Sequence, residues 1–459
     1  MSVSEFTFAT ANKFEVKAYG AIGDGKTIDT QAINQAIEAA NRAGGGTVYF
    51  AQGNYLANGI ILKSNVTLEI SKNAKITAAT SGYNPPEKNR FDLYQSFGQS
   101  YFHNSLILAE DVRHIAIVGS GQISAANLKH DDIVEPGFGN KVIALRRIKH
   151  FKLLDVTIDS GGYSTFTSKN SDNILIERIT IKGKRKGISL IDTRGVNIKQ
   201  INVETQDDAI SLISDYSGGT RSYSENIVIR NSTLQSICCH AIRFGPETVG
   251  NFKNILFENI KIVSAGTGGI ALSAQDGAHI ENMVFRDIQM SQVTYPIEIK
   301  SNARKKIAPV SPLRKYDKVP VFFNRTPKPS QPGRINTINF ENISIDNTNH
   351  DMQPISVSGN AVDKVRISNI RFSNIDLNYE NGSDAVRSSF DKALGINIKF
   401  AQNITLDRIN FTFDKNPNTP LIFADDVVNL YLNEVKLGKR ALPANKKKLI
   451  RIKNLQTRD

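Results

Sequence analysis

Two consecutive carboxylates, Asp207 and Asp208, are the residues of this chain most suited to chemistry. Lys186 precedes Asp208 by 22 residues, and His240 follows it by 32. Paired carboxylates suit general acid–base chemistry when their surroundings keep one protonated and the other ionised. A neighbouring cation favours the ionised form of a carboxylate. We therefore predict an acid–base site built from these four side chains.

Two further cations, Arg243 and Lys300, are candidates for binding an anionic group of a substrate. A guanidinium offers paired N–H donors that match the oxygens of a carboxylate or sulfate. The chain has 57 Lys and Arg against 44 Asp and Glu, a net charge of +13, which also favours an acidic partner. No nucleic-acid recognition motif accompanies this charge. We therefore expect an anionic polysaccharide or oligosaccharide as the partner.

A short repeated phrase indicates how these residues are positioned. Each copy starts with a polar residue, usually Asn, and continues with alternating apolar and polar residues, which is typical of strands. Clear copies start at Asn173, Asn226, Asn254, Asn282, Thr337, Lys364, Asn403 and Asn429, and weaker ones at Asn65, His114, His150 and Asn197. Starts from Asn173 to Asn282 are 24, 29, 28 and 28 residues apart. One or two strands per copy at this period predict an all-β fold, a single-stranded right-handed parallel β-helix.

The ends of this solenoid define its predicted organisation. A helix from about Ile28 to Arg42, capped by Asp29 or Thr30 and ended by the glycines at 44–46, would close the first coil. We predict one domain over residues 1–459, with a cap at about 14–46, coils at about 47–440 and a loop insertion at 301–334 beside the cleft.

A second strand after each phrase can be aligned from coil to coil. Its apolar positions form two inward ladders: Ile188, Ile210, Ile242, Ile270, Ile297 and Ile355, then Leu190, Leu212, Phe244, Leu272, Ile299 and Val357. Residues between them face outward, with coils about 4.8 Å apart, so we expect Lys186, Asp208 and His240 to lie on neighbouring coils. A structural network of ion pairs is the alternative interpretation of this cluster.

The only two cysteines, Cys238 and Cys239, are adjacent in the sequence. Neighbouring cysteines rarely fit the geometry of a disulfide, so we expect no disulfide framework and two buried thiols on a strand. With no other thiolate in the chain, they do not predict a metal site, and we expect neither a metal nor a cofactor.

The segment from Tyr19 to Thr27, followed by Asp29 and Thr30, resembles the opening motif of the polygalacturonase-type glycoside hydrolases of family 28 and their pectinase-like relatives. The resemblance extends to about Lys300. That family carries, in order on successive coils, an NTD motif, a double Asp, a GHG motif and an RIK motif. It implies the same β-helix fold and hydrolysis of a uronic-acid polymer such as pectin.

This chain keeps the order of those motifs but changes several residues. The double Asp is Asp207-Asp208, and His240 stands at the GHG histidine without its glycines. Lys300 matches the lysine of RIK, whose arginine has become Glu298. Lys186 stands where the NTD motif has its aspartate.

The resemblance implies that Asp207 is the general acid and that Asp208 activates water on the opposite face, which inverts the anomeric centre. Asp208 must then work alone or recruit another carboxylate such as Glu298. His240 would support the carboxylates. Tyr295 is the candidate for stacking on a sugar ring, because the chain has no Trp.

Two other functions remain open from the sequence. A β-helix polysaccharide lyase or epimerase would use Lys186 or Arg243 to remove the proton next to a carboxylate. A non-catalytic glycan-binding β-helix would explain the lost aspartate. No apolar run of 18 residues predicts a membrane span. We expect a monomer that is secreted or periplasmic once a signal has been removed, with the cytoplasm as the alternative.

Overall fold

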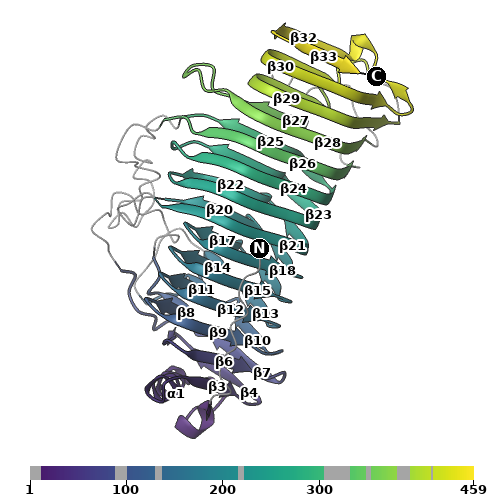
Figure 1. Ribbon diagram of the computed structural model, residues 1–459. Coiled ribbons are helices and arrows are strands. Elements are labelled where there is room, and N and C mark those ends of the chain that lie inside the picture. The colour runs from purple at the N-terminus through teal and green to yellow at the C-terminus, as the bar shows by residue number, and fades with distance from the viewer. Residues whose placement is uncertain are drawn as a thin grey trace, which may run out of the picture. The chain divides into compact units, whose positions relative to one another are not determined.

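The structure is a computed structural model that describes residues 12–87, 101–129, 137–215, 222–303, 331–347, 353–379, 393–414 and 417–458. The chain divides into two compact units. Unit 1 comprises residues 1–227 and 307–325, and unit 2 comprises residues 228–306 and 326–459. Both consist mainly of parallel strands wound in coils, which confirms the predicted right-handed parallel β-helix (Figure 1). A single domain over 1–459 stays a prediction.

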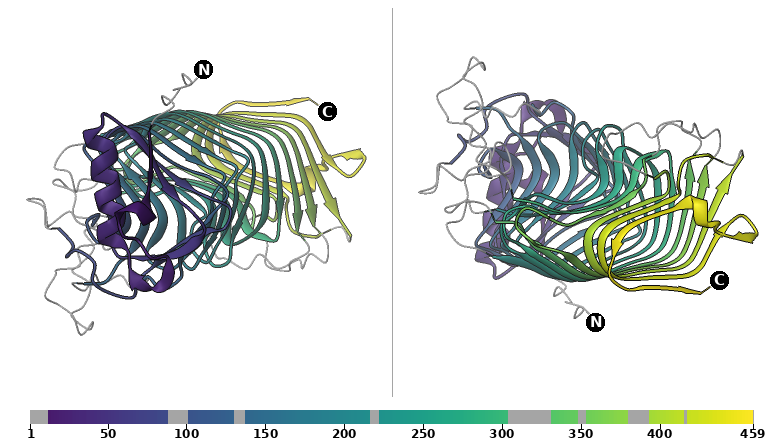
Figure 2. Two further views of the ribbon diagram at one scale, coloured as in Figure 1. Left: turned by 90° about the horizontal axis from the view of Figure 1, so that it is seen from below. Right: turned by 90° about the horizontal axis from the view of Figure 1, so that it is seen from above.

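Unit 1 begins with a cap. It contains β1 (Lys13–Glu15), a 3-10 turn (Val16–Tyr19), β2 (Asp24–Ile28) and helix α1 (Thr30–Arg42). One face of α1 packs on the first coils (Figure 2). The helix confirms the prediction, but Asp29 does not cap it, because its carboxylate accepts the backbone N–H groups of Ile22 and Gly23 instead.

The coils of unit 1 have three strands each, arranged in three rows. The first row is β3 (Gly46–Phe50), β6 (Val66–Ile70), β9 (Arg113–Val118), β12 (Lys149–Leu154), β15 (Asp172–Glu177) and β18 (Arg194–Lys199). The second row is β4 (Gly53–Ala57), β7 (Ala74–Ala78), β10 (Gln122–Ala125), β13 (Thr157–Ser160), β16 (Thr180–Gly183) and β19 (Asn202–Thr205). The third row is β5 (Ile60–Ile61), β8 (Ser105–Glu110), β11 (Lys141–Arg146), β14 (Ser164–Lys169), β17 (Lys186–Ile191) and β20 (Ile210–Ser214). The sequence indicated one or two strands per coil because the short second-row strands run on from the repeated phrase.

In unit 2 the strands are longer and each passes through bends. They are β22 (His240–Thr248), β23 (Asn251–Ala274), β24 (His279–Ser291), β25 (Val293–Ser301), β26 (Arg334–Asn347), β27 (Ile355–Ser358), β28 (Ile367–Tyr379), β29 (Ile396–Phe413), β30 (Ile422–Leu437), β31 (Arg440–Ala441), β32 (Lys447–Ile452) and β33 (Leu455–Arg458). Strand β21 (Tyr223–Ser236) precedes them across the unit boundary. All the registered pairs of unit 2 are parallel except β30 with β31.

The predicted inward ladders are confirmed within each unit. In unit 1, Ile188 is level with Ile210 and Leu190 with Leu212. In unit 2, the ladders continue as Ile242, Ile270 and Ile297, and as Phe244, Leu272, Ile299 and Val357. All of these side chains are buried. The alternation of strands therefore sends the intervening residues outward.

The polar residue that opens each phrase lies at a bend, in the left-handed backbone conformation that Asn tolerates. Asn254 and Asn282 have φ of 56° and 55°, and their amides are hydrogen-bonded to each other. Two predicted starts are out of register. Gly195 is level with Asn173, rather than Asn197, and Asn369 is level with Thr337, rather than Lys364.

Candidate active site

Lys186 and Asp208 meet in unit 1, where β17 and β20 begin. The backbone N–H of Gly187 donates to the carbonyl of Asp208, which holds the two residues level. A Cβ at Gly187 would lie 2.5 Å from the carbonyl oxygen of Ala209, so only glycine allows this approach. Lys186 Nζ is 3.8 Å from Asp208 Oδ2, and Ser211 Oγ donates to the same oxygen at 3.3 Å. Both charged side chains are buried, and Asp208 is wholly so.

Asp207 lies beside this pair but is more accessible, with 20% of its side chain exposed. Its Oδ1 accepts the backbone N–H of Asp208 at 2.7 Å, which fixes the orientation of the carboxylate. Arg185 Nε lies 3.4 Å from Oδ2. The two consecutive carboxylates therefore have different surroundings, one buried against a lysine and one at the surface beside an arginine.

The ring of Tyr163, just before β14, gathers the cations of this region. The guanidinium carbon of Arg185 is 4.3 Å from its centroid, and the Nζ atoms of Lys186 and Lys141 are each 5.9 Å away. Lys141 donates to the carbonyl of Tyr101. Lys141 is wholly buried, and this burial lowers its pKa to about 7. None of these contacts to Tyr163 was predicted from the sequence, which gives no signal for a ring shared between coils.

A second charged cluster occupies the other end of β14, β17 and β20. Lys169 Nζ is 2.5 Å from Asp215 Oδ1, and Asp192 accepts the hydroxyl of Ser214 at 2.5 Å. Lys169, Asp192 and Asp215 are all at least 95% buried. Burial, together with the charge of Asp215, raises the pKa of Asp192 to about 7. The sequence analysis missed this cluster, because its two aspartates follow strands at positions outside the repeated phrase.

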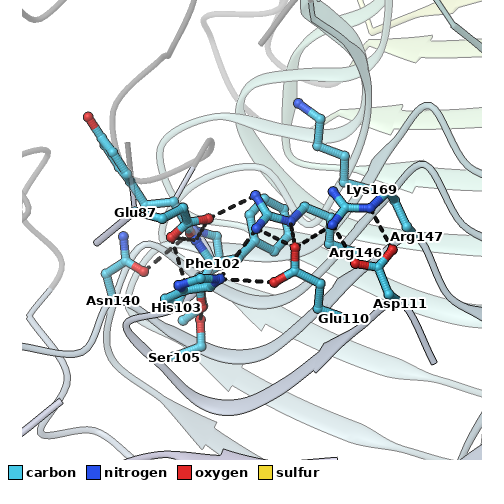
Figure 3. Close-up of polar contacts among 12 residues, drawn as sticks. Glu87, Phe102, His103, Ser105, Glu110, Asp111, Asn140, Arg146, Arg147 and Lys169 are labelled. Atoms are coloured by element: carbon cyan, nitrogen blue, oxygen red, sulfur yellow. Dashed lines mark hydrogen bonds and ion pairs between the residues drawn. The ribbon is translucent and has the colours of Figure 1, made fainter. Parts of the chain in front are cut away.

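A third charged network lies across the first coils of the same row (Figure 3). Glu110 accepts hydrogen bonds from Arg146 Nε at 2.8 Å and from Arg147, and His103 Nε2 lies 2.9 Å away. Burial raises the pKa of Glu110, but the hydrogen bond to His103 and the charge of Arg146 outweigh it and lower the pKa. Glu87 accepts the N–H groups at 102 and 103 and pairs with Arg146 at 2.9 Å. The network fastens the segment before β8 to β11.

The remaining predicted site residues lie in unit 2. His240 opens β22, level with Gly268 of β23, which is level with Tyr295 of β25. A Cβ at Gly268 would lie 3.1 Å from His240 Cδ2 and 3.0 Å from the Tyr295 carbonyl oxygen. Glycine therefore gives the His240 ring its place beside the neighbouring strand.

Arg243, Glu298 and Lys300 face outward from the same strands. Arg243 is level with Ala271, and Ala271 with Glu298, so two strand spacings separate the arginine from the glutamate. Lys300 is level with Ser273 and is exposed, whereas Arg243 and Glu298 are half-buried.

The predicted residues thus form two sets. Unit 1 brings together Lys186, Asp207 and Asp208. Unit 2 places His240 and Tyr295 in one row and Arg243 and Glu298 in another, with Lys300 two residues beyond Glu298. The placement of His240 on the coil next to Asp208 joins the two units and stays a prediction. The predicted insertion at 301–334 falls mainly on 304–330, outside the described residues.

The expectation of two buried thiols was wrong. Cys238 and Cys239 form a disulfide in a bend between β21 and β22. Cys238 is exposed and Cys239 half-buried, because 237–239 leave the strand. Among the residues that the structure describes, no three His, Cys, Asp or Glu side chains gather as a possible metal site. In that same part of the chain, no helix is long and apolar enough to cross a membrane.

Known proteins share parts of this architecture. Alginate lyase 7 of Azotobacter vinelandii is 49% identical over 70 residues, which are 15% of this chain and only 8% of that protein. Polygalacturonase-2 of Solanum lycopersicum is 23% identical over 317 residues, covering 64% of each chain. The solved structure of a hyperthermoactive exopolygalacturonase from Thermotoga maritima superposes with a TM-score of 0.67 at 18% identity, over 87% of this chain and 91% of that one. At this identity the structural likeness establishes the fold alone.

A family match covers more of the chain. Residues 13–271, more than half of the sequence, match the family described as rhamnogalacturonase A/epimerase, pectate lyase-like. The matched range includes the carboxylates of unit 1 as well as His240 and Arg243. The chain belongs to the rhamnogalacturonase A/epimerase, pectate lyase-like family.

Proposed function

We propose that the protein is a glycoside hydrolase that cleaves an anionic polysaccharide or oligosaccharide, containing uronic acid or sulfate, with inversion at the anomeric carbon. The observation that carries the proposal is the pairing at the start of β17 and β20. An accessible carboxylate, Asp207, lies there beside a buried carboxylate, Asp208, that pairs with Lys186. The family and the polygalacturonase-like fold support it.

In this proposal the two carboxylates have separate roles. Asp207, at the surface, carries the proton that passes to the oxygen of the leaving sugar. Lys186 and Ser211 favour the ionised form of Asp208, which a base requires. Water attacks the anomeric carbon and gives its proton to Asp208, while the glycosidic C–O bond breaks. Lys186 thus supports one base in place of the second carboxylate of family 28.

The residues of unit 2 would contact the rest of the substrate. Arg243 and Lys300 are proposed to bind carboxylate or sulfate groups, and Tyr295 to stack on a sugar ring. His240 would support the acid–base pair, and Glu298 is the further carboxylate available on that face. Their outward positions on β22 and β25 support these roles.

The test is a panel of pectic, algal and host glycans, each incubated with the protein and assayed for new reducing ends. A hydrolase releases reducing ends without new absorbance near 235 nm. Release from acidic glycans alone would support the proposal. If no glycan in the panel gains reducing ends, the hydrolase assignment fails.

A polysaccharide lyase or epimerase is the second candidate. Lys186 at the position of a family carboxylate favours it, since these reactions need a base to remove the proton beside the sugar's carboxylate. A lyase would create an unsaturated product that absorbs near 235 nm. An epimerase would leave the chain length unchanged and introduce deuterium at C5 in heavy water. Binding without any product would instead indicate a glycan-binding module.

A further inference from the structure

Arg185 has a position that none of the roles above uses. It lies between β16 and β17, with its guanidinium carbon 4.3 Å from the centroid of the Tyr163 ring. Its side chain is 23% exposed, and Nε reaches Asp207 Oδ2 at 3.4 Å. The arginine therefore lies beside the proposed general acid and within reach of solvent.

Tyr163 is well placed to hold that guanidinium. Its backbone N–H donates to the carbonyl of Asn140 at 2.6 Å, and its carbonyl accepts the N–H of Lys186 at 3.4 Å. The ring is only 6% exposed. Stacking occupies the face of a guanidinium, so the N–H donors of Arg185 point along its plane, where Nε meets Asp207.

The exposure of the neighbouring cations singles out Arg185. Three cations, Lys141, Arg185 and Lys186, surround the ring of Tyr163. Lys141 is wholly buried, and Lys186 is buried against Asp208. Of these three, Arg185 is the one that an anion entering from solvent would meet.

We propose that Arg185, oriented by Tyr163, binds the carboxylate of the uronate ring that reaches Asp207, and so determines the preference for an acidic sugar. This inference rests on the proposed function, and it names the residue that recognises the charge next to the acid. A planar guanidinium fits a carboxylate through two parallel N–H donors, and this geometry is lost when lysine replaces arginine.

The experiment measures the binding of a uronic-acid trisaccharide and of its carboxyl-reduced counterpart by calorimetry, on the full chain. The variants are Arg185→Gln, Arg185→Lys and Tyr163→Leu. Lys184→Gln is the matched control, because it removes the same charge one residue away, where Lys184 Nζ contacts the Ala126 carbonyl at 3.4 Å. The melting temperature of each variant reports its folding.

Arg185→Gln should raise Kd for the acidic trisaccharide about ten- to a hundredfold, the usual effect of losing a charge-assisted contact. Its Kd for the neutral trisaccharide should stay within about twofold of wild type. Lys184→Gln should leave both values within about twofold. Arg185→Lys and Tyr163→Leu should weaken acidic binding less than Arg185→Gln does. Should Arg185→Gln fail to fold, the same split between acidic and neutral binding in Arg185→Lys decides the question.

Equal losses in Arg185→Gln and Lys184→Gln would overturn the inference, since the effect would be one of net charge. Equal losses for both sugars in Arg185→Gln would also overturn it. Wild-type protein that binds the acidic sugar through Arg185 without cutting it would end the hydrolase proposal and leave this inference standing. Wild-type protein that cuts glycans without preferring acidic ones would do the reverse.

Discussion

The two ends of the strands β14, β17 and β20 carry the same charged residues in different surroundings. At the beginning of these strands, Lys186 stands with Asp207 and Asp208, and at their end Lys169 stands with Asp192 and Asp215. The far cluster is buried throughout, with an ion pair of 2.5 Å. The near cluster has a looser pair of 3.8 Å and one carboxylate that solvent reaches.

This difference separates a structural cluster from a chemical one. A buried ion pair with short contacts contributes mainly to the folded state, because removing one partner exposes the other to a low-dielectric interior. An accessible carboxylate beside a buried, ionised one has what acid–base catalysis requires. The comparison therefore predicts that mutations at the near end affect activity and that mutations at the far end affect stability.

The largest expected effect is on catalysis at the near end. Asp207→Asn and Asp208→Asn should each lower kcat by at least about a hundredfold, the scale of general acid–base catalysis. Asp207→Asn should keep a melting temperature close to that of wild type, because its side chain is partly exposed. Initial rates on an acidic oligosaccharide measure the effect. Near-full activity in Asp208→Asn would mean that the water is activated elsewhere.

At the far end, Asp215→Asn should lower the free energy of unfolding by about 3–5 kcal/mol, since it removes the ion pair of buried Lys169. The kcat of the folded variant should remain within about twofold of wild type. Urea unfolding and initial rates at low temperature give the two quantities. A loss of activity without a loss of stability would reverse the roles of the two ends.

The pH dependence of stability also distinguishes the far end. Burial and Asp215 raise the pKa of Asp192 from 3.8 to about 7. Because this folded-state pKa is above the unfolded one, the folded chain binds the proton more tightly, and stability falls as pH rises from about 4 through 7. Asp192→Asn should unfold like wild type at pH 5 and be more stable than wild type at pH 8. Urea titrations at both pH values test this, and an unchanged difference between them would contradict it.

An exposed ion pair should show the smallest effect. Arg178 and Asp155 pair at 2.6 Å, but their side chains are 45% and 41% exposed. Asp155→Asn should therefore cost only about 0.2–1 kcal/mol. Measured beside Asp215→Asn, it isolates the contribution of burial. Equal costs for the two variants would show that burial is not what distinguishes the far cluster.

Much of the fold follows from local patterns in the sequence. Strand alternation places Ile188 and Ile210 in the core, and the register confirms it. The register at the bends was less predictable, because a glycine such as Gly195 can take the left-handed position that Asn takes elsewhere. Cys238 was assigned to a strand for the same reason, since nothing local marks the end of β21.

The candidate site was predictable in its residues but not in its environment. Neighbours in sequence, Asp207 and Asp208 differ fully in burial, which depends on the packing of other coils. Tyr163 and Arg185 are separated by 22 residues and meet only because coils stack. The far cluster combines residues from three strand ends, and no spacing in the sequence indicates it.

The most direct test of acid–base hydrolysis at the near end is the configuration of the first product. Proton NMR, recorded in the first minutes of digestion of an acidic oligosaccharide, reports the anomer before mutarotation mixes the two forms. Asp207 as acid and Asp208 as base for water predict a new reducing end with the anomeric configuration opposite to that of the bond cut. A product with retained configuration, or one with an unsaturated uronate, would contradict the account.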